Sequence, residues 1–158
     1  MPPRQLEQVL VAGWGPDWQA QFQRFDMQPI AAASIGQVHR AVALDGRDLA
    51  IKVQYPGIRA SIDSDVDNVA TLLRVSGLLP QGLDINLQLS EAKRQLHEES
   101  DYLREAEMMQ RYGKMLAGED AFLVPQAYAP LSGRNVLAMD FIEARPVESL
   151  LAAPLEVR

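Results

Sequence analysis

The stretch Pro29–Lys52, PIAAASIGQVHRAVALDGRDLAIK, decides the fold of this chain and indicates the kind of site to expect. It begins with a small-residue loop, Ala31–Ser34, and continues into a strand-like run, Ile35–Ala43. A turn at Asp45-Gly46 leads into a second apolar run, Arg47–Tyr55. Asp-Gly between two such runs is the strongest short-range hairpin signal in the chain. We therefore expect an antiparallel hairpin with a backbone loop immediately before it.

Lys52 lies within the second of these strands, on the face away from the bulky apolar side chains. Leu49, Ile51 and Val53 share one face because side chains alternate along a strand, and Lys52 belongs to the other face. A loop of small residues lets phosphate oxygens approach backbone N–H groups, and a nearby lysine supplies the countercharge. The pattern predicts an anionic ligand beside Lys52, and we expect a nucleotide.

The composition excludes several classes of protein. The 158 residues include 21 acidic and 15 basic ones with no dense basic run, so a nucleic-acid groove is not expected. The absence of cysteine excludes disulfides, cysteine-based zinc sites and thiol nucleophiles, and it fits a reducing, cytoplasmic location. His39 and His97 lack the spacing of metal ligands, and we predict no metal site. No run approaches the roughly 20 apolar residues that span a bilayer.

The remaining periodicities predict an α+β fold, in which a small antiparallel sheet of about five strands packs on two long helices. We expect three parts: a short N-terminal helical segment (1–25), a sheet-and-helix lobe (26–143) and a tail (144–158). The expected helices are 3–12, 18–25, 58–79 and 85–116, and two further strands are expected at 122–129 and 135–142. Trp18, Phe22 and Phe25 are predicted to form one packed face.

Glu99 occupies an unusual position in the predicted helix 85–116. It falls within a stripe of apolar residues separated by steps of three and four, where a bare carboxylate would be costly. A buried lysine and a buried glutamate each ionise less readily alone, whereas together they remain charged. We therefore predict that Glu99 pairs with Lys52, and that the pair and the loop form a phosphate clamp.

Three motifs in this order resemble the UbiB/AarF-type (ABC1-like) family of atypical protein kinases. AAASIGQVHRA is similar to the family's alanine-rich loop, LAIKVQYPG to its strand-three lysine motif, and EESDYLREA to its Glu-x-Asp signature. The resemblance extends from about Met1 to about Glu148. It implies a kinase-like N-lobe from a parent protein that acts as an atypical kinase or ATPase and supports ubiquinone (coenzyme Q) biosynthesis.

The resemblance also implies roles for individual residues, with ATP or ADP as the cofactor. Lys52 would contact the α- and β-phosphates, with Glu99 as its partner. Asp101 matches the second signature acid; it lies about 200° from Glu99 on an ideal helix, and its role is left open. VLAMDFIEA resembles the fifth strand and hinge, with Met139 as gatekeeper. The phosphate-covering loop would be Ala31, Ala32, Ala33 and Ser34, and the adenine-binding backbone would be that of Asp140 and Ile142.

The sequence also departs from the family pattern. Lys-x-Gly-Gln, the catalytic-loop Asp and Asn, and Asp-Phe-Gly do not occur in it. We therefore expect a fragment, a truncated gene product or an excised lobe that performs no phosphotransfer alone, with Mg²⁺ bound only in the full-length protein. Expected partners are a missing C-lobe or a full-length relative, and the parent protein could associate peripherally with membrane or lipid. The alternative is a non-catalytic interaction module or a remnant.

Overall fold

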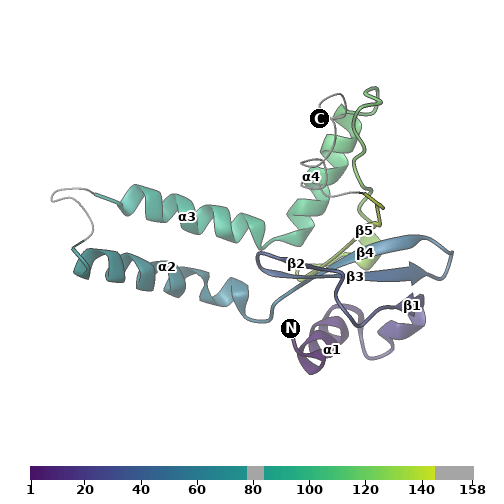
Figure 1. The fold of residues 1–158 in the computed structure, drawn as a ribbon, viewed down its shortest axis with the longest axis horizontal. Helices are drawn as coiled ribbons and strands as arrows, with labels where there is room; N and C mark the ends of the chain where they lie inside the picture. The colour runs from purple at the N-terminus through teal and green to yellow at the C-terminus, as the bar shows by residue number, and fades with distance from the viewer. Residues whose placement is uncertain (78–83, 145–158) are drawn as a thin grey trace, which may run out of the picture.

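The structure is a computed structural model that describes residues 1–77 and 84–144. In these residues it contains four α-helices, two short 3-10 helices and five strands (Figure 1). In chain order they are α1 (Pro3–Trp14), η1 (Trp18–Gln21), β1 (Phe22–Phe25), β2 (Ala31–Ala33), β3 (Gly36–Ala43), β4 (Asp48–Gln54), α2 (Ile58–Val75), α3 (Asn86–Glu99), α4 (Tyr102–Met115), η2 (Ala129–Leu131) and β5 (Val136–Asp140).

The five strands form one antiparallel sheet with the order β1-β3-β4-β5, and β2 also pairs with β3. The predicted hairpin is β3–β4, in which Val38 lies opposite Lys52. Gly46 adopts φ +87° in the connecting turn, a conformation that glycine enters at little steric cost. On the other side of β4, Leu137 of β5 also lies opposite Lys52. The structure thus confirms the predicted α+β fold with a five-stranded antiparallel sheet.

The two faces of the sheet pack against different helices. Leu49, Ile51 and Val53 are fully buried on the face that contacts α1, as their alternation along the strand predicts. The aromatic cluster of Trp14, Trp18, Phe22 and Phe25 extends this core, with ring centroids 4.9–6.4 Å apart. Helix α4 covers the other face, where Tyr102, Ala106 and Leu137 form a second buried cluster. Lys52 therefore lies on the α4 side of the sheet.

Helices α2 and α3 form an antiparallel pair that extends away from the sheet (Figure 1). Helix α3 has no buried residue, and α2 buries only Ile62 and Ala70. Among the described residues, no helix is long and apolar enough to cross a membrane.

Two predicted helices are wrong in detail. The single helix expected at 85–116 is two helices, because α3 ends at Glu99 and α4 begins at Tyr102 in another direction (Figure 1). The helix expected at 18–25 is a 3-10 turn followed by strand β1, since Phe22–Phe25 pairs with β3.

Two predicted extended segments also differ. Residues 122–129 contain no strand but only an isolated bridge between Ala127 and Met139. The expected loop Ala31–Ser34 is largely strand β2, since Ala31–Ala33 pairs with β3. The helix expected at 58–79 ends earlier, at Val75, and Gly77 follows with a positive φ. Residues 145–158 of the tail lie outside the described residues, and the three predicted domain ranges stay predictions.

Candidate functional site: a lysine–glutamate pair under the alanine segment

The centre of the candidate site is an ion pair between strand β4 and helix α4. Lys52 Nζ donates to both carboxylate oxygens of Glu105, at 2.9 Å each. The Lys52 side chain is 17% exposed and that of Glu105 is 33% exposed, so protein covers most of the pair. Such a pair holds the lysine side chain in a fixed position, while its ammonium group retains one N–H for another acceptor.

The predicted partner of Lys52, Glu99, is not the residue that the structure pairs with it. Glu99 is exposed at the end of α3, and its carboxylate accepts a hydrogen bond from Ser34 Oγ. The expectation of a buried Glu99 is therefore wrong as well. The prediction of burial assumed one continuous helix with one apolar face. Because the helix breaks after Glu99, the following residues belong to a second helix with a different axis.

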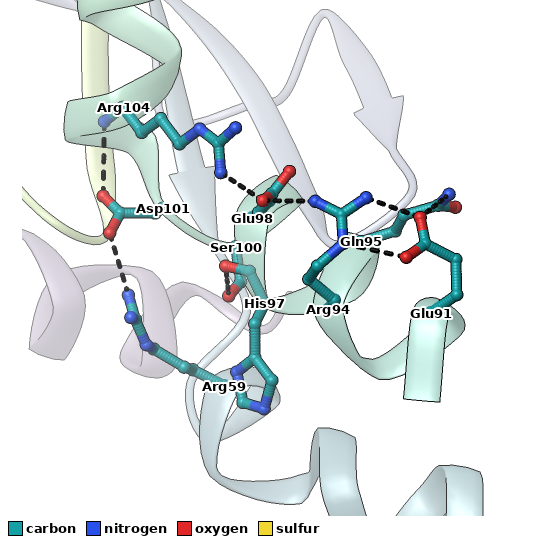
Figure 2. Close-up of polar contacts among 9 residues, drawn as sticks. All are labelled: Arg59, Glu91, Arg94, Gln95, His97, Glu98, Ser100, Asp101 and Arg104. Atoms are coloured by element: carbon teal, nitrogen blue, oxygen red, sulfur yellow. Dashed lines mark hydrogen bonds and ion pairs between the residues drawn. The ribbon is translucent and has the colours of Figure 1, made fainter. Parts of the chain in front are cut away.

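The break between α3 and α4 is held by contacts from β4, from α2 and from the first turn of α4 itself. Ser100 is fully buried, and its carbonyl accepts from Gln54 Nε2 at 3.0 Å. Asp101, the signature acid of open role, caps α4 by accepting from the Arg104 N–H at 3.3 Å, and it also meets Arg59 of α2 at 3.5 Å (Figure 2). Burial alone would raise the pKa of the Asp101 carboxyl, but these contacts outweigh it and hold the pKa below its ordinary value. Asp101 is thus a helix N-cap in this structure.

A chain of charges links the two helices across the same break. Arg94 of α3 contacts both Glu91 and Glu98, and Glu98 also contacts Arg104 of α4 (Figure 2). The Arg104 guanidinium, assisted by Arg94, holds the pKa of the Glu98 carboxyl below its ordinary value. Networks of this kind are geometrically more specific than isolated surface pairs. The pair between Glu98 and Arg104 spans the break and so connects the end of α3 to the first turn of α4, where Glu105 lies.

The ion pair opens onto a cleft of about 320 Å³. Three carboxylates, two cationic groups and one methionine line it, and the predicted residues Lys52 and Glu99 both belong to this set. The lining residues are Lys52, Glu98, Glu99, Arg104, Glu105 and Met108.

The alanine segment lies near this cleft through its link to Glu99. Ala31, Ala32 and Ser34 are exposed, and Ala33 is half-buried. Ser34 directly follows β2, and its hydrogen bond to Glu99 connects the segment Ala31–Ser34 to helix α3. At Gly36 an added Cβ would lie 2.3 Å from the Val53 carbonyl oxygen, so only glycine permits this approach of β3 to β4.

The predicted hinge residues follow strand β5. Met139 is half-buried and packs against the cluster on the α4 side of the sheet, whereas Ile142 is 37% exposed. The Asp140 N–H donates to the Gln126 carbonyl at 3.0 Å, and its carboxylate accepts from the Gln126 N–H and the Tyr128 hydroxyl. The Asp140 N–H is therefore already used within the protein, which leaves its carbonyl as the group to consider for an adenine contact.

Sequence reasoning missed Glu105, Gln54 and Tyr102, all of which build the site. A signal for Glu105 was present. Ser100-Asp101 is a typical N-cap pair, and a helix that begins there places Tyr102, Glu105 and Ala106 on one face. Gln54 follows Lys52 by two residues, so alternation places both side chains on the α4 side of β4.

The described residues contain no group of three or more His, Asp or Glu side chains placed to hold a metal ion. Glu98 and Glu105 each already bind a cationic side chain.

Comparison with known proteins gives the family of this chain. Residues 1–155 match the model of the ABC1 atypical kinase-like domain, and the chain belongs to that family. Similar curated proteins include the atypical kinase coq-8, mitochondrial, of Caenorhabditis elegans, at 40% identity over the whole chain. The atypical kinase COQ8, mitochondrial, of Schizosaccharomyces pombe is 44% identical over 90% of the chain.

A solved structure shares the fold. The complex of Rv3197 with erythromycin from Mycobacterium tuberculosis matches 97% of this chain with a TM-score of 0.79 and 31% identity. The chain spans 39% of that structure's chain, and 21% and 23% of the C. elegans and S. pombe proteins. It thus corresponds to a part of each of these relatives.

Proposed function

We propose that this chain is the nucleotide-binding lobe of a UbiB-type atypical kinase or ATPase that supports ubiquinone (coenzyme Q) biosynthesis. The observation that carries the proposal is the bidentate contact between Lys52 and Glu105, close to a segment of small residues. A strand lysine held by a helix glutamate is the arrangement that kinases use to contact nucleotide phosphates. Membership of the atypical kinase-like family supports the same function.

Each part of the site has a role in this proposal. Lys52 contacts the α- and β-phosphates of ATP or ADP, and Glu105 keeps its ammonium group in place. The alanine segment covers the phosphates, with Ser34 held by Glu99. Met139, with the Asp140 carbonyl and the Ile142 N–H, receives the adenine.

The chain alone is expected to bind nucleotide without transferring a phosphoryl group. Its sequence contains neither the catalytic-loop motif nor Asp-Phe-Gly, which supply the metal-binding acids of kinases. Mg²⁺ is accordingly assigned to the full-length protein, where a C-lobe completes the cleft. We propose a cytoplasmic location, with peripheral contact of the parent protein to membrane or lipid. The C. elegans and S. pombe relatives are named as mitochondrial.

Calorimetric titration of the purified chain with ATP and with ADP tests the proposal. Lys52→Ala should weaken binding at least tenfold, because charge-assisted hydrogen bonds to phosphate are the strong ones. Lys93→Ala is the matched control, since Lys93 is a lysine of α3 paired with Asp67 away from the cleft. Equal affinity in the wild type and Lys52→Ala would sink the assignment of Lys52, and no binding by the wild type would sink the proposed lobe function.

A second candidate function is a non-catalytic interaction module. It is favoured by apolar side chains on the projecting helix pair, where Leu72, Val75 and Leu87 are 67%, 77% and 76% exposed. Light scattering of the chain alone and with a full-length relative tests it. A monodisperse monomer that binds no relative argues against this second candidate.

A further inference from the structure

Tyr102 is a fully buried phenol in the first turn of α4, and the roles assigned so far do not explain it. Its side chain packs in the cluster between α4 and the sheet, with Ala106 and Leu137. Its hydroxyl has no hydrogen-bond partner among the described residues. Buried tyrosines ordinarily pair that group, and phenylalanine would fill a similar space without it. The aromatic ring is therefore the part of this side chain to which the surrounding contacts can assign a role.

The surroundings of the side chain suggest a role. The ring lies under Lys52, with Nζ 4.7 Å from the ring centroid. Glu105, three residues after Tyr102 in α4, binds the same Nζ. One turn of this helix therefore contacts the ammonium group with both a carboxylate and an aromatic face. The hydroxyl end of the ring reaches the start of β3, because a Cβ added at Gly36 would lie 3.1 Å from the Tyr102 hydroxyl.

We propose that Tyr102 is a positioning residue for the phosphate-binding lysine, whose ammonium group its ring holds beside Glu105. An ammonium group over an aromatic face is attracted by the ring quadrupole, and the attraction is larger where water is excluded. The inference rests on the proposed nucleotide-binding function, since it concerns the cation assigned to the phosphates. Because Tyr102 lies in the first turn of α4, its contacts also relate the position of this helix to Lys52 and to Gly36 at the start of β3.

The first test needs no nucleotide. The chain contains three lysines, Lys52, Lys93 and Lys114, and mass spectrometry can follow the acylation rate of each by an amine-reactive ester. In Tyr102→Leu, Lys52 should react about threefold to thirtyfold faster, the range expected for a lost cation–π contact. Lys93 and Lys114 should react as before, and Tyr102→Phe should behave as the wild type.

The matched control is Leu10→Ala. Leu10 is fully buried in the core on the other face of the sheet, so this variant is destabilised without loss of a contact to Lys52. An equal change at Lys52 in Leu10→Ala and Tyr102→Leu, or no change in either, overturns the proposal. If Tyr102→Leu does not fold, phenylalanines with increasing ring fluorination at position 102 preserve the shape and weaken the quadrupole. They should raise Lys52 acylation stepwise, and a flat series overturns the proposal.

The second test is ATP affinity, measured by calorimetry on the same variants. It should fall about threefold to thirtyfold in Tyr102→Leu and remain unchanged in Tyr102→Phe. If the wild type binds ATP and every variant binds it with the same affinity, Tyr102 does not position the lysine for phosphate. If the wild type binds no ATP, the proposed function has failed, and the acylation rates alone decide whether Tyr102 holds Lys52.

Discussion

Glu105→Gln should destabilise the folded chain much more than Glu99→Gln. The Lys52–Glu105 pair is intermediate between two measured classes of ion pair, with side chains 17% and 33% exposed. Exposed pairs contribute about 0.2–1 kcal/mol, and loss of one partner from a fully buried pair costs about 3–5 kcal/mol. We therefore expect Glu105→Gln to lower the free energy of unfolding by about 2 kcal/mol, or about 4–8 °C in Tm for a chain of this size.

Glu99→Gln is the matched control because the substitution is chemically identical six residues away. Glu99 is exposed, and a glutamine oxygen can still accept from Ser34, so we expect a loss below about 0.5 kcal/mol. The assay is urea unfolding at pH 7 followed by circular dichroism, for both variants and for each combined with Lys52→Met. A coupling energy to Lys52 larger for Glu99 than for Glu105 would refute the pairing that the structure shows.

Three further predictions concern the surroundings of the site. Gly36→Ala should lower the free energy of unfolding by about 1–3 kcal/mol, since the new Cβ would lie 2.3 Å from the Val53 carbonyl oxygen; urea unfolding measures it. Asp101→Ala should cost about 1 kcal/mol in the same assay, because α4 loses its N-cap. Burial lowers the pKa of His39 below its ordinary value of about 6.5, even though the Asp26 carbonyl accepts from Nδ1. Since only the unfolded chain then binds a proton, unfolding free energy should decrease as pH falls below about 6.5.

Each of these predictions has a control. Gly133→Ala should be nearly neutral, because an added Cβ there meets nothing within 4 Å, and a loss equal to that of Gly36→Ala would contradict the steric argument. Asp101→Asn keeps a capping oxygen and should lose less than Asp101→Ala. His39→Leu should remove its share of the pH dependence between pH 7.5 and 5.5, and an unchanged slope would show that His39 is not its source.

Local patterns predicted the parts of the fold that depend on neighbouring residues. Alternation along Leu49–Val53 identified both faces of β4, and Asp45-Gly46 identified the hairpin turn. The break at Ser100 was not predicted, because steps of three and four continue through it as though the helix were unbroken. The local N-cap at Asp101 marks the start of α4, and a contact from outside the helix supports the break, since the Gln54 side chain of β4 donates to the Ser100 carbonyl.

The sequence by itself determined the family, the sheet with its hairpin, and the lysine that faces away from the bulky core residues, because these depend on motifs and on the period of a strand. Only the tertiary structure decided which glutamate meets that lysine. Glu99 and Glu105 are six residues apart, and a helix that is broken between them turns one outward and the other toward Lys52. The choice depends on the direction of α4. The cap at Asp101 and the pair between Glu98 and Arg104 are local, but the contacts from Gln54 of β4 and Arg59 of α2 come from segments distant in sequence.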